Sequence, residues 1–106
     1  MNLKDEKLAG VVKELAAEYI NREANKNALI TVTRAEILNR GKRATIFFTV
    51  LPETEQDKSL EFLKRKTSDF RLFLSNKKVV GFAPAIRFEI DFGERNRQRI
   101  DELSNQ

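Results

Sequence analysis

Apolar side chains recur at intervals of three and four residues over the first twenty positions of the chain. They are Leu8, Val11, Val12, Leu15, Ala16, Tyr19 and Ile20. This spacing gathers them on one side of an amphipathic helix, as is typical of a helix that packs on a core. Asn2 is expected to cap this helix, and Asp5 and Glu6 in its first turn complement the helix dipole.

Two β-strands are predicted to follow, at residues 29–38 and 43–51. Both are rich in β-branched residues and alternate between apolar and polar positions. In the first strand the apolar phase changes by one residue, which predicts a β-bulge near Arg34. Residues 39–42 form a turn in which Gly41 can adopt a positive φ. The pattern therefore predicts a β-hairpin with one buried face.

Two shorter helices are predicted after the hairpin. Residues 54–57 form a variant capping box that begins a helix with Leu60 and Leu63 on its buried side. This helix runs into a polar segment in which Ser68 is a second potential N-cap, so a new helix is expected to begin there. It is expected to end near residues 75–76. A polar junction, where one helix could have continued, is the most unusual local feature of the chain.

A third strand is predicted to begin at Pro84 and to end at Gly93. Its inward-facing residues are expected to be Ile86, Phe88 and Ile90, and its outward-facing residues Arg87, Glu89 and Asp91. Residues 93–106 are interpreted as a charged tail that Ile100 and Leu103 anchor. The resulting order of elements predicts a single α+β domain over residues 1–106, with its helices on one face of a three-stranded sheet.

The composition describes one small domain without a membrane span. The chain has 106 residues, of which 41% are hydrophobic and 34% are charged. A chain of this length supports one core, and its apolar share is too high for an intrinsically disordered protein. Its apolar runs are too short for a transmembrane helix, and its N-terminus lacks the apolar segment of a secretory signal. We therefore expect a cytoplasmic protein that does not contact a membrane.

The sequence contains neither cysteine nor histidine. This excludes disulfides, zinc sites of the usual kind, a cysteine nucleophile and the most common proton shuttle at neutral pH. No segment resembles a calcium-binding loop. We expect no catalytic residue, no metal, no cofactor and no small-molecule substrate.

The positive charge is concentrated in two blocks. The whole chain has 20 Lys and Arg residues and 16 Asp and Glu residues, a net charge of +4. Residues 34–52 carry four basic and one acidic side chain, a net charge of +3, and residues 64–81 carry six basic and one acidic, a net charge of +5. Such blocks are typical of proteins that bind polyanions, although solvated surfaces also contain them.

An ordered set of segments resembles a known family. These segments are 32–37, 44–51, the polar helix junction, 70–71, Pro84 before the third strand, and 99–103. Together they resemble the bacterial ribosome-binding factor A family over roughly residues 29–103, and the N-terminal helix is compatible with it.

The resemblance implies a type II KH-like fold with the element order predicted above. It also implies a non-catalytic factor that binds the small ribosomal subunit and its rRNA late in assembly, near the decoding-region helix. Such factors assist maturation of the rRNA ends and matter most in the cold. In that family an Ala-any-Gly kink replaces the KH glycine loop, and the matching residues here, 66–68, include neither Ala nor Gly. We therefore expect a minimal or divergent member in which capping by Ser68 makes the bend.

Two clusters of residues are candidates for binding RNA phosphates. The junction cluster, our leading candidate, combines cations with hydroxyls and free backbone N–H groups at a helix start. It comprises Lys64, Arg65, Lys66, Thr67, Ser68 and Arg71, with Asn76, Lys77 and Lys78 continuing the surface. The turn cluster comprises Arg40, Lys42 and Arg43. Both clusters have a simpler explanation, because helix C-termini and soluble turns also favour cations.

Two single residues are further candidates. Phe47 lies between Thr45 and Thr49 on the outward face of the predicted hairpin. It is suited to stacking on a base, to packing across the strands or to being covered by the C-terminal tail. Arg99 is a minor candidate for an RNA contact, within a segment whose arginines alternate with acids.

Three functions remain open at this stage. The first is a ribosome assembly factor that binds the small ribosomal subunit and its rRNA. The second is a basic protein-interaction domain that docks an acidic partner, and the third is a free-standing RNA-binding module. The missing glycine loop argues against the third, because KH modules grip single strands there. We expect the protein to be a monomer.

Overall fold

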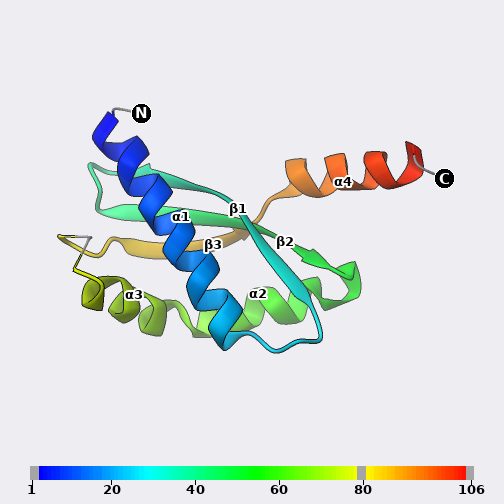
Figure 1. Ribbon diagram of the computed structural model, residues 1–106, viewed down its shortest axis with the longest axis horizontal. Helices are drawn as coiled ribbons and strands as arrows, with labels where there is room; N and C mark the ends of the chain where they lie inside the picture. The colour runs from blue at the N-terminus through cyan, green and yellow to red at the C-terminus, as the bar shows by residue number, and fades with distance from the viewer. Residues whose placement is uncertain (1–2, 79–80, 105–106) are drawn as a thin grey trace.

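Three strands form one mixed sheet, and three helices pack on one of its faces (Figure 1). The computed structural model describes residues 3–78 and 81–104, and these counts refer to that part of the chain. The elements are α1 (Leu3–Glu23), β1 (Leu29–Leu38), β2 (Arg43–Leu51), the 3₁₀ helix η1 (Glu53–Glu55), α2 (Gln56–Arg65), α3 (Thr67–Asn76), β3 (Ala85–Ile90) and α4 (Phe92–Ser104). This is the predicted α+β, type II KH-like topology, with α4 added after the last strand.

The sheet has β2 at its centre. β1 pairs with β2 antiparallel, and β3 pairs with β2 parallel along its other side. The bounds of β1 and β2 agree with the strands predicted from alternation. The pairing register shifts between Val32 and Arg34, which confirms the predicted bulge. The shift places Arg34 directly opposite Phe47 on the face of the sheet that points away from the helices.

The core lies between the helices and the inner face of the sheet. Its buried members include Val12, Ala16, Tyr19 and Ile20 of α1, as the helical periodicity predicts, together with Phe48, Leu63, Phe70, Leu74 and Phe88. Tyr19 is fully buried, and its Oη donates a hydrogen bond of 2.5 Å to Asp69 Oδ2 of α3. Burial, followed by this hydrogen bond, raises the pKa of Tyr19 above its usual value. The predicted cap Asn2 lies outside the described residues.

The two predicted helix caps are wrong. The chain enters η1 after Pro52, so Thr54 lies inside that turn, and Glu55 precedes α2 without a side-chain capping bond. At the junction Lys66 occupies the N-cap position of α3, again without a side-chain cap, because α3 begins at Thr67. Ser68 is therefore a residue inside the helix and does not make the bend.

The junction is instead one non-helical residue between two nearly continuous helices. Lys66 has φ −90° and ψ 1°, and its backbone N–H donates to the carbonyls of Phe62 and Leu63, both at 3.1 Å. Thr67 Oγ1 also donates to the Leu63 carbonyl, at 3.1 Å. A threonine hydroxyl bonded to the carbonyl four residues earlier bends a helix. The bend thus coincides with Thr67.

The C-terminal segment differs from the predicted tail. Residues 92–104 form α4, which projects from the body of the molecule in Figure 1. Ile100 and Leu103 are 62% and 69% exposed, so they do not anchor it. The strand ends at Ile90, and Asp91, expected to face solvent, is only 8% exposed. Asp91 accepts a hydrogen bond of 3.0 Å from the backbone N–H of Glu94 and thereby begins the helix.

Candidate nucleic-acid interface

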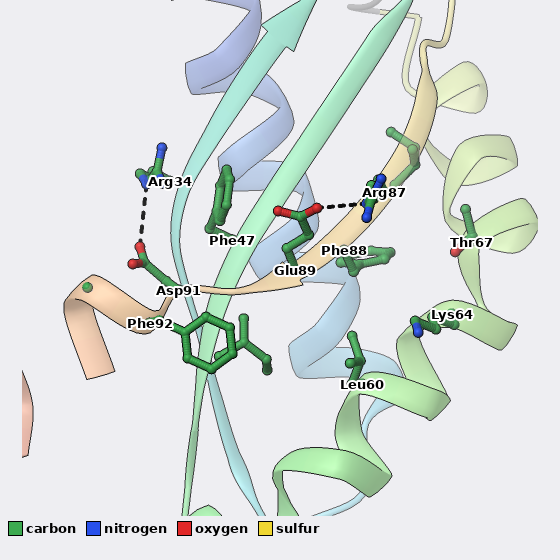
Figure 2. Close-up of a pocket in the computed structure, with 13 residues that line it drawn as sticks. Arg34, Phe47, Leu60, Lys64, Thr67, Arg87, Phe88, Glu89, Asp91 and Phe92 are labelled. Atoms are coloured by element: carbon green, nitrogen blue, oxygen red, sulfur yellow. Dashed lines mark ion pairs between the residues drawn. The ribbon is translucent and has the colours of Figure 1, made fainter. Parts of the chain in front are cut away.

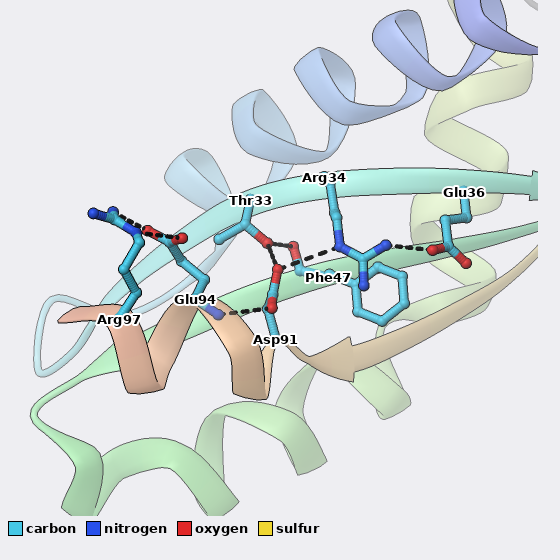
Figure 3. A network of polar contacts seen from close by, with 7 residues as sticks. All are labelled: Thr33, Arg34, Glu36, Phe47, Asp91, Glu94 and Arg97. Carbon is cyan, nitrogen blue, oxygen red and sulfur yellow. Dashed lines mark hydrogen bonds and ion pairs between the residues drawn. The ribbon is translucent and has the colours of Figure 1, made fainter. Parts of the chain in front are cut away.

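On the outer face of the sheet, charged side chains form ion pairs with one another around Phe47 (Figure 3). The Arg34 guanidinium carbon lies 3.8 Å from the centroid of the Phe47 ring. Arg34 also forms ion pairs with Glu36 and, at 3.4 Å, with Asp91. A base could stack on that side of Phe47 only by displacing Arg34. The geometry favours the packing interpretation of Phe47.

Asp91 is the centre of this network. Thr33 Oγ1 donates to Asp91 Oδ2 at 2.6 Å, and the Glu94 N–H donates to Asp91 Oδ1. Burial alone would raise the pKa of Asp91. The hydrogen bonds from Thr33 and Glu94 and the charge of Arg34 outweigh burial, so the pKa lies below its usual value. Asp91 therefore acts as a structural joint between β1 and α4.

A depression of about 760 Å³ lies between the outer side of β3 and the α2–α3 junction (Figure 2). Its charged lining residues are Arg34, Lys64, Arg87, Glu89 and Asp91. Arg87 pairs with Glu89 at 2.7 Å, as Arg34 does with Asp91. Its cations are therefore largely neutralised within the protein, and Lys64 is the exception in the part of the chain that the structure describes.

A second, strongly basic depression, here called the basic groove, has a volume of about 990 Å³. It lies where the start of α1, the β1–β2 turn and the segment before β3 meet. Its lining includes five cations and one carboxylate from the described residues, namely Lys4, Lys7, Arg40, Lys42, Arg71 and Asp5. The apolar side chains of Leu8, Val11 and Phe82 complete it.

Backbone geometry and hydrogen bonds hold the three parts of the basic groove together. Gly41 has φ +86°, and a Cβ placed on it would lie 3.8 Å from Leu8 Cδ2, so the turn packs against α1. The Ala85 N–H donates to the Lys42 carbonyl at 2.8 Å. Arg71 Nε and Nη2 donate to the carbonyl of Ala83 at 3.2 and 3.0 Å, which fixes the segment before β3 to α3.

The structure divides the predicted site residues differently from the sequence. Arg71 was grouped with the junction cluster, but it lines the basic groove with Arg40 and Lys42 of the turn cluster. Lys64 lines the depression beside β3 instead. Arg43 is exposed and lines neither depression.

The remaining predicted residues continue the surface of α2 and α3. Arg65 lies in α2, Ser68 and Asn76 lie in α3, and Lys78 follows two residues after α3. Lys66 Nζ lies 5.8 Å from the Phe62 ring centroid. Lys77 pairs with Glu18 at 3.1 Å, so its charge is already matched within the protein.

Ion pairing separates the cations that are available to a ligand from those that are not. Arg40, Lys42, Arg43, Lys64 and Arg65 form no ion pair with a carboxylate of residues 3–78 or 81–104. The arginines of α4 are engaged: Arg97 pairs with Glu94 and Asp101, and Arg99 with Glu53. The Arg99 hydrogen bond lowers the pKa of Glu53. Arg99 is therefore a poor candidate for an RNA contact.

Sequence reasoning missed Lys4, Lys7 and Phe82. Residues 1–33 carry five basic and five acidic side chains. Because their net charge is zero, the segment was not recognised as basic and these two lysines were not proposed as ligands of phosphate. Phe82 stands alone between predicted elements, where no periodicity marks it.

Other kinds of site find no support in the described residues. No three Asp, Glu, His or Cys side chains there lie close enough together to hold a metal ion. Within the same ranges, no helix is both long and apolar enough to cross a membrane.

Comparisons with known proteins converge on one family. The sequence profile described as ribosome-binding factor A matches residues 4–104. The ribosome-binding factor A of Macrococcus caseolyticus is 29% identical over 111 residues, which cover 98% of this chain and 97% of the relative. That of Pseudothermotoga lettingae is 33% identical over 78 residues, which cover 73% of this chain and 66% of the relative.

The fold is also similar to that of a solved structure. The crystal structure of ribosome-binding factor A from Thermus thermophilus superposes with a TM-score of 0.72 at 18% identity. The superposition covers 81% of this chain and 94% of the other. At this identity the likeness speaks for the fold, and it agrees with the predicted KH-like topology.

Proposed function

Because this chain belongs to the ribosome-binding factor A family, we propose that it is a ribosome assembly factor that binds the small ribosomal subunit. It makes its main contacts with the phosphates of the rRNA during late maturation. It works by binding and not by catalysis, as a cytoplasmic monomer, and it matters most in the cold.

The observation that carries this proposal is the basic groove, in which Arg40 and Lys42 form no ion pair with a carboxylate of the described residues. Five cations and one carboxylate give the groove a charge of +4 within the described residues. Phosphate contacts from Lys and Arg supply nearly all of the non-specific affinity of proteins for nucleic acid and a large share of the specific affinity, and they set the position of the protein on it. The unpaired Lys64 and Arg65 at the junction extend the basic surface along α2.

Sedimentation with ribosomal subunits tests the proposal. We expect the purified protein to travel with isolated small subunits through a sucrose gradient. Binding should weaken linearly when log K is plotted against log salt, by about 0.7–0.9 per phosphate neutralised. Sedimentation with the large subunit, or with neither subunit, would contradict the proposal.

Binding to protein-free rRNA separates the proposal from docking on an acidic protein. If phosphates are the ligand, small-subunit rRNA stripped of its proteins should still bind, with a similar salt slope. If the protein binds intact subunits but not their rRNA, the partner is a ribosomal protein and the proposed rRNA contact is wrong.

A further inference from the structure

Phe82 is an exposed aromatic side chain at the edge of the basic groove. It is 67% exposed, although the two residues that follow it, Ala83 and Pro84, are buried. The hydrogen bonds from Arg71 to the Ala83 and Pro84 carbonyls fix this segment, and the Arg71 guanidinium carbon lies 5.9 Å from the Phe82 ring centroid. The fold thus presents a ring to solvent from a well-anchored position beside a positive charge.

Two parts of the groove carry positive charge at positions that do not favour folding. Lys4 lies in the first turn of α1, where the helix dipole disfavours positive charge, and Lys7 follows one turn later on the same side. Arg40 has φ +56°, a left-handed conformation that is unfavourable for a residue with a Cβ. Residues held in sparsely populated backbone conformations, as Arg40 is, cluster at functional sites. Here both bring positive charge into the same groove.

The combination of cations and an exposed ring indicates the chemistry of the ligand. The cations are suited to binding phosphates. The aromatic ring is suited to stacking on a base, and it can stack on any of the bases because each has a π-face. A base in a duplex is stacked between its neighbours and cannot reach such a ring, so an unpaired base is required.

We propose that the basic groove binds an unpaired nucleotide of RNA, whose base stacks on Phe82 while flanking phosphates contact Lys4, Lys7, Arg40 and Lys42. This inference rests on the proposed function and specifies the kind of rRNA feature that the protein recognises: a bulged, looped or single-stranded residue.

The test uses the full chain and a short oligouridylate labelled with fluorescein, followed by fluorescence anisotropy. The oligouridylate should bind as a single strand and bind more weakly when paired with its complement. Phe82→Leu removes the aromatic face but keeps an apolar side chain, and should weaken single-strand binding roughly 5- to 150-fold.

Phe92→Leu is the matched control. Phe92 is also exposed, at 55%, and also lies beside an arginine, with the Arg95 guanidinium carbon 4.8 Å from its ring centroid, but it does not line the basic groove. Its replacement should leave the affinity unchanged. Equal losses in the two variants, or no loss in Phe82→Leu, would overturn the inference.

A second measurement reports stacking directly. In an oligouridylate that carries one iodouridine, irradiation should crosslink the base to the peptide that contains Phe82, as mapped by mass spectrometry. A crosslink confined to another peptide would overturn the inference even if the affinities behave as expected.

Failure of this inference and failure of the proposed function give different results. If the wild type sediments with small subunits and Phe82→Leu sediments equally well and binds the oligouridylate equally well, the nucleotide site is wrong and the assembly role stands. If the wild type does not sediment with ribosomal subunits but binds single-stranded RNA through Phe82, the assembly role is wrong and the nucleotide site stands.

Discussion

Thr33 Oγ1 donates a hydrogen bond of 2.6 Å to Asp91 Oδ2, across 58 positions of sequence. Thr33 lies at the bulge of β1, and Asp91 also accepts the N–H of Glu94 in the first turn of α4. One carboxylate therefore joins the sheet to the helix that follows it. The ion pair between Arg34 and Asp91 belongs to the same joint.

We predict that Thr33 and Asp91 are energetically coupled. Thr33→Val should reduce the free energy of unfolding by about 1–2 kcal/mol, because it removes a hydrogen bond to a partly shielded carboxylate. Asp91→Ala should cost at least as much and should lower the helical circular dichroism signal, because α4 loses its cap. Urea denaturation of both variants and of the double variant measures the coupling, expected to exceed about 0.5 kcal/mol.

Thr31→Val is the control for this cycle. Thr31 lies on the same strand and is exposed. Its replacement should shift stability by less than about 0.5 kcal/mol. If the effects of Thr33→Val and Asp91→Ala on the free energy of unfolding are strictly additive, the hydrogen bond between Thr33 and Asp91 does not contribute to stability in solution.

Acid should remove the contribution of the Asp91 carboxylate to the free energy of unfolding. Folding lowers the pKa of Asp91, so its ionised form stabilises the folded state above the ordinary value of 3.8. That stabilisation is lost as the pH falls below 3.8 and through the lower pKa of the folded state. The stability difference between the wild type and Asp91→Asn should therefore be full near neutral pH and shrink in acid.

Chemical denaturation at a series of pH values measures this difference. Arg97 lowers the pKa of Glu94 and the charge of Asp91 acts against that lowering, so the comparison reports Asp91 together with its smaller effect on Glu94. A difference that stays constant from neutral pH into strong acid would mean that Asp91 is not held in its ionised form.

Ser68→Ala should be close to neutral. Ser68 is a residue inside α3 and the helix start has no side-chain capping bond, so its replacement should change the free energy of unfolding by less than about 0.5 kcal/mol. Thermal denaturation is sufficient to check this. Thr54→Ala should behave in the same way, because Thr54 lies within η1. A loss of about 1 kcal/mol in the Ser68 variant would restore the capping hypothesis.

The basic groove and the junction should not contribute equally to subunit binding. Arg40→Gln with Lys42→Gln should weaken binding more than Lys64→Gln with Arg65→Gln, although each pair removes two charges. The reason is that Arg40 and Lys42 share a concave surface with Lys4, Lys7 and Arg71, where their fields reinforce one another. This reverses the sequence-based preference for the junction cluster.

The salt slope provides the measurement for this comparison. Each lost phosphate contact should flatten the plot of log K against log salt by nearly one unit. Circular dichroism must first show that both double variants are folded. Equal losses would indicate a diffuse positive field, and a larger loss in the junction pair would place the RNA on α2 and α3.

The elements that depend on local pattern were predictable from the sequence. The bounds of β1 and β2 follow from the alternation of apolar and polar positions and from a turn with Gly41, whose φ is +86°. The bulge beside Arg34 follows from the one-residue change of apolar phase, because a strand cannot otherwise keep both halves of its apolar set on one face. The buried face of α1 was predictable because a spacing of three and four residues places the apolar side chains on one side of a helix.

Features that depend on contacts between distant residues came only from the tertiary structure. Asp91 looks like an outward strand residue until the bulge brings Thr33 within hydrogen-bond distance, and α4 lacks the apolar stripe by which a packed helix is recognised. The caps at Thr54 and Ser68 were misplaced because η1 and the nearly continuous junction shift the helix starts by one to a few residues. The basic groove joins α1, the β1–β2 turn and the segment before β3, and charge counted along a chain cannot reveal which segments meet in space.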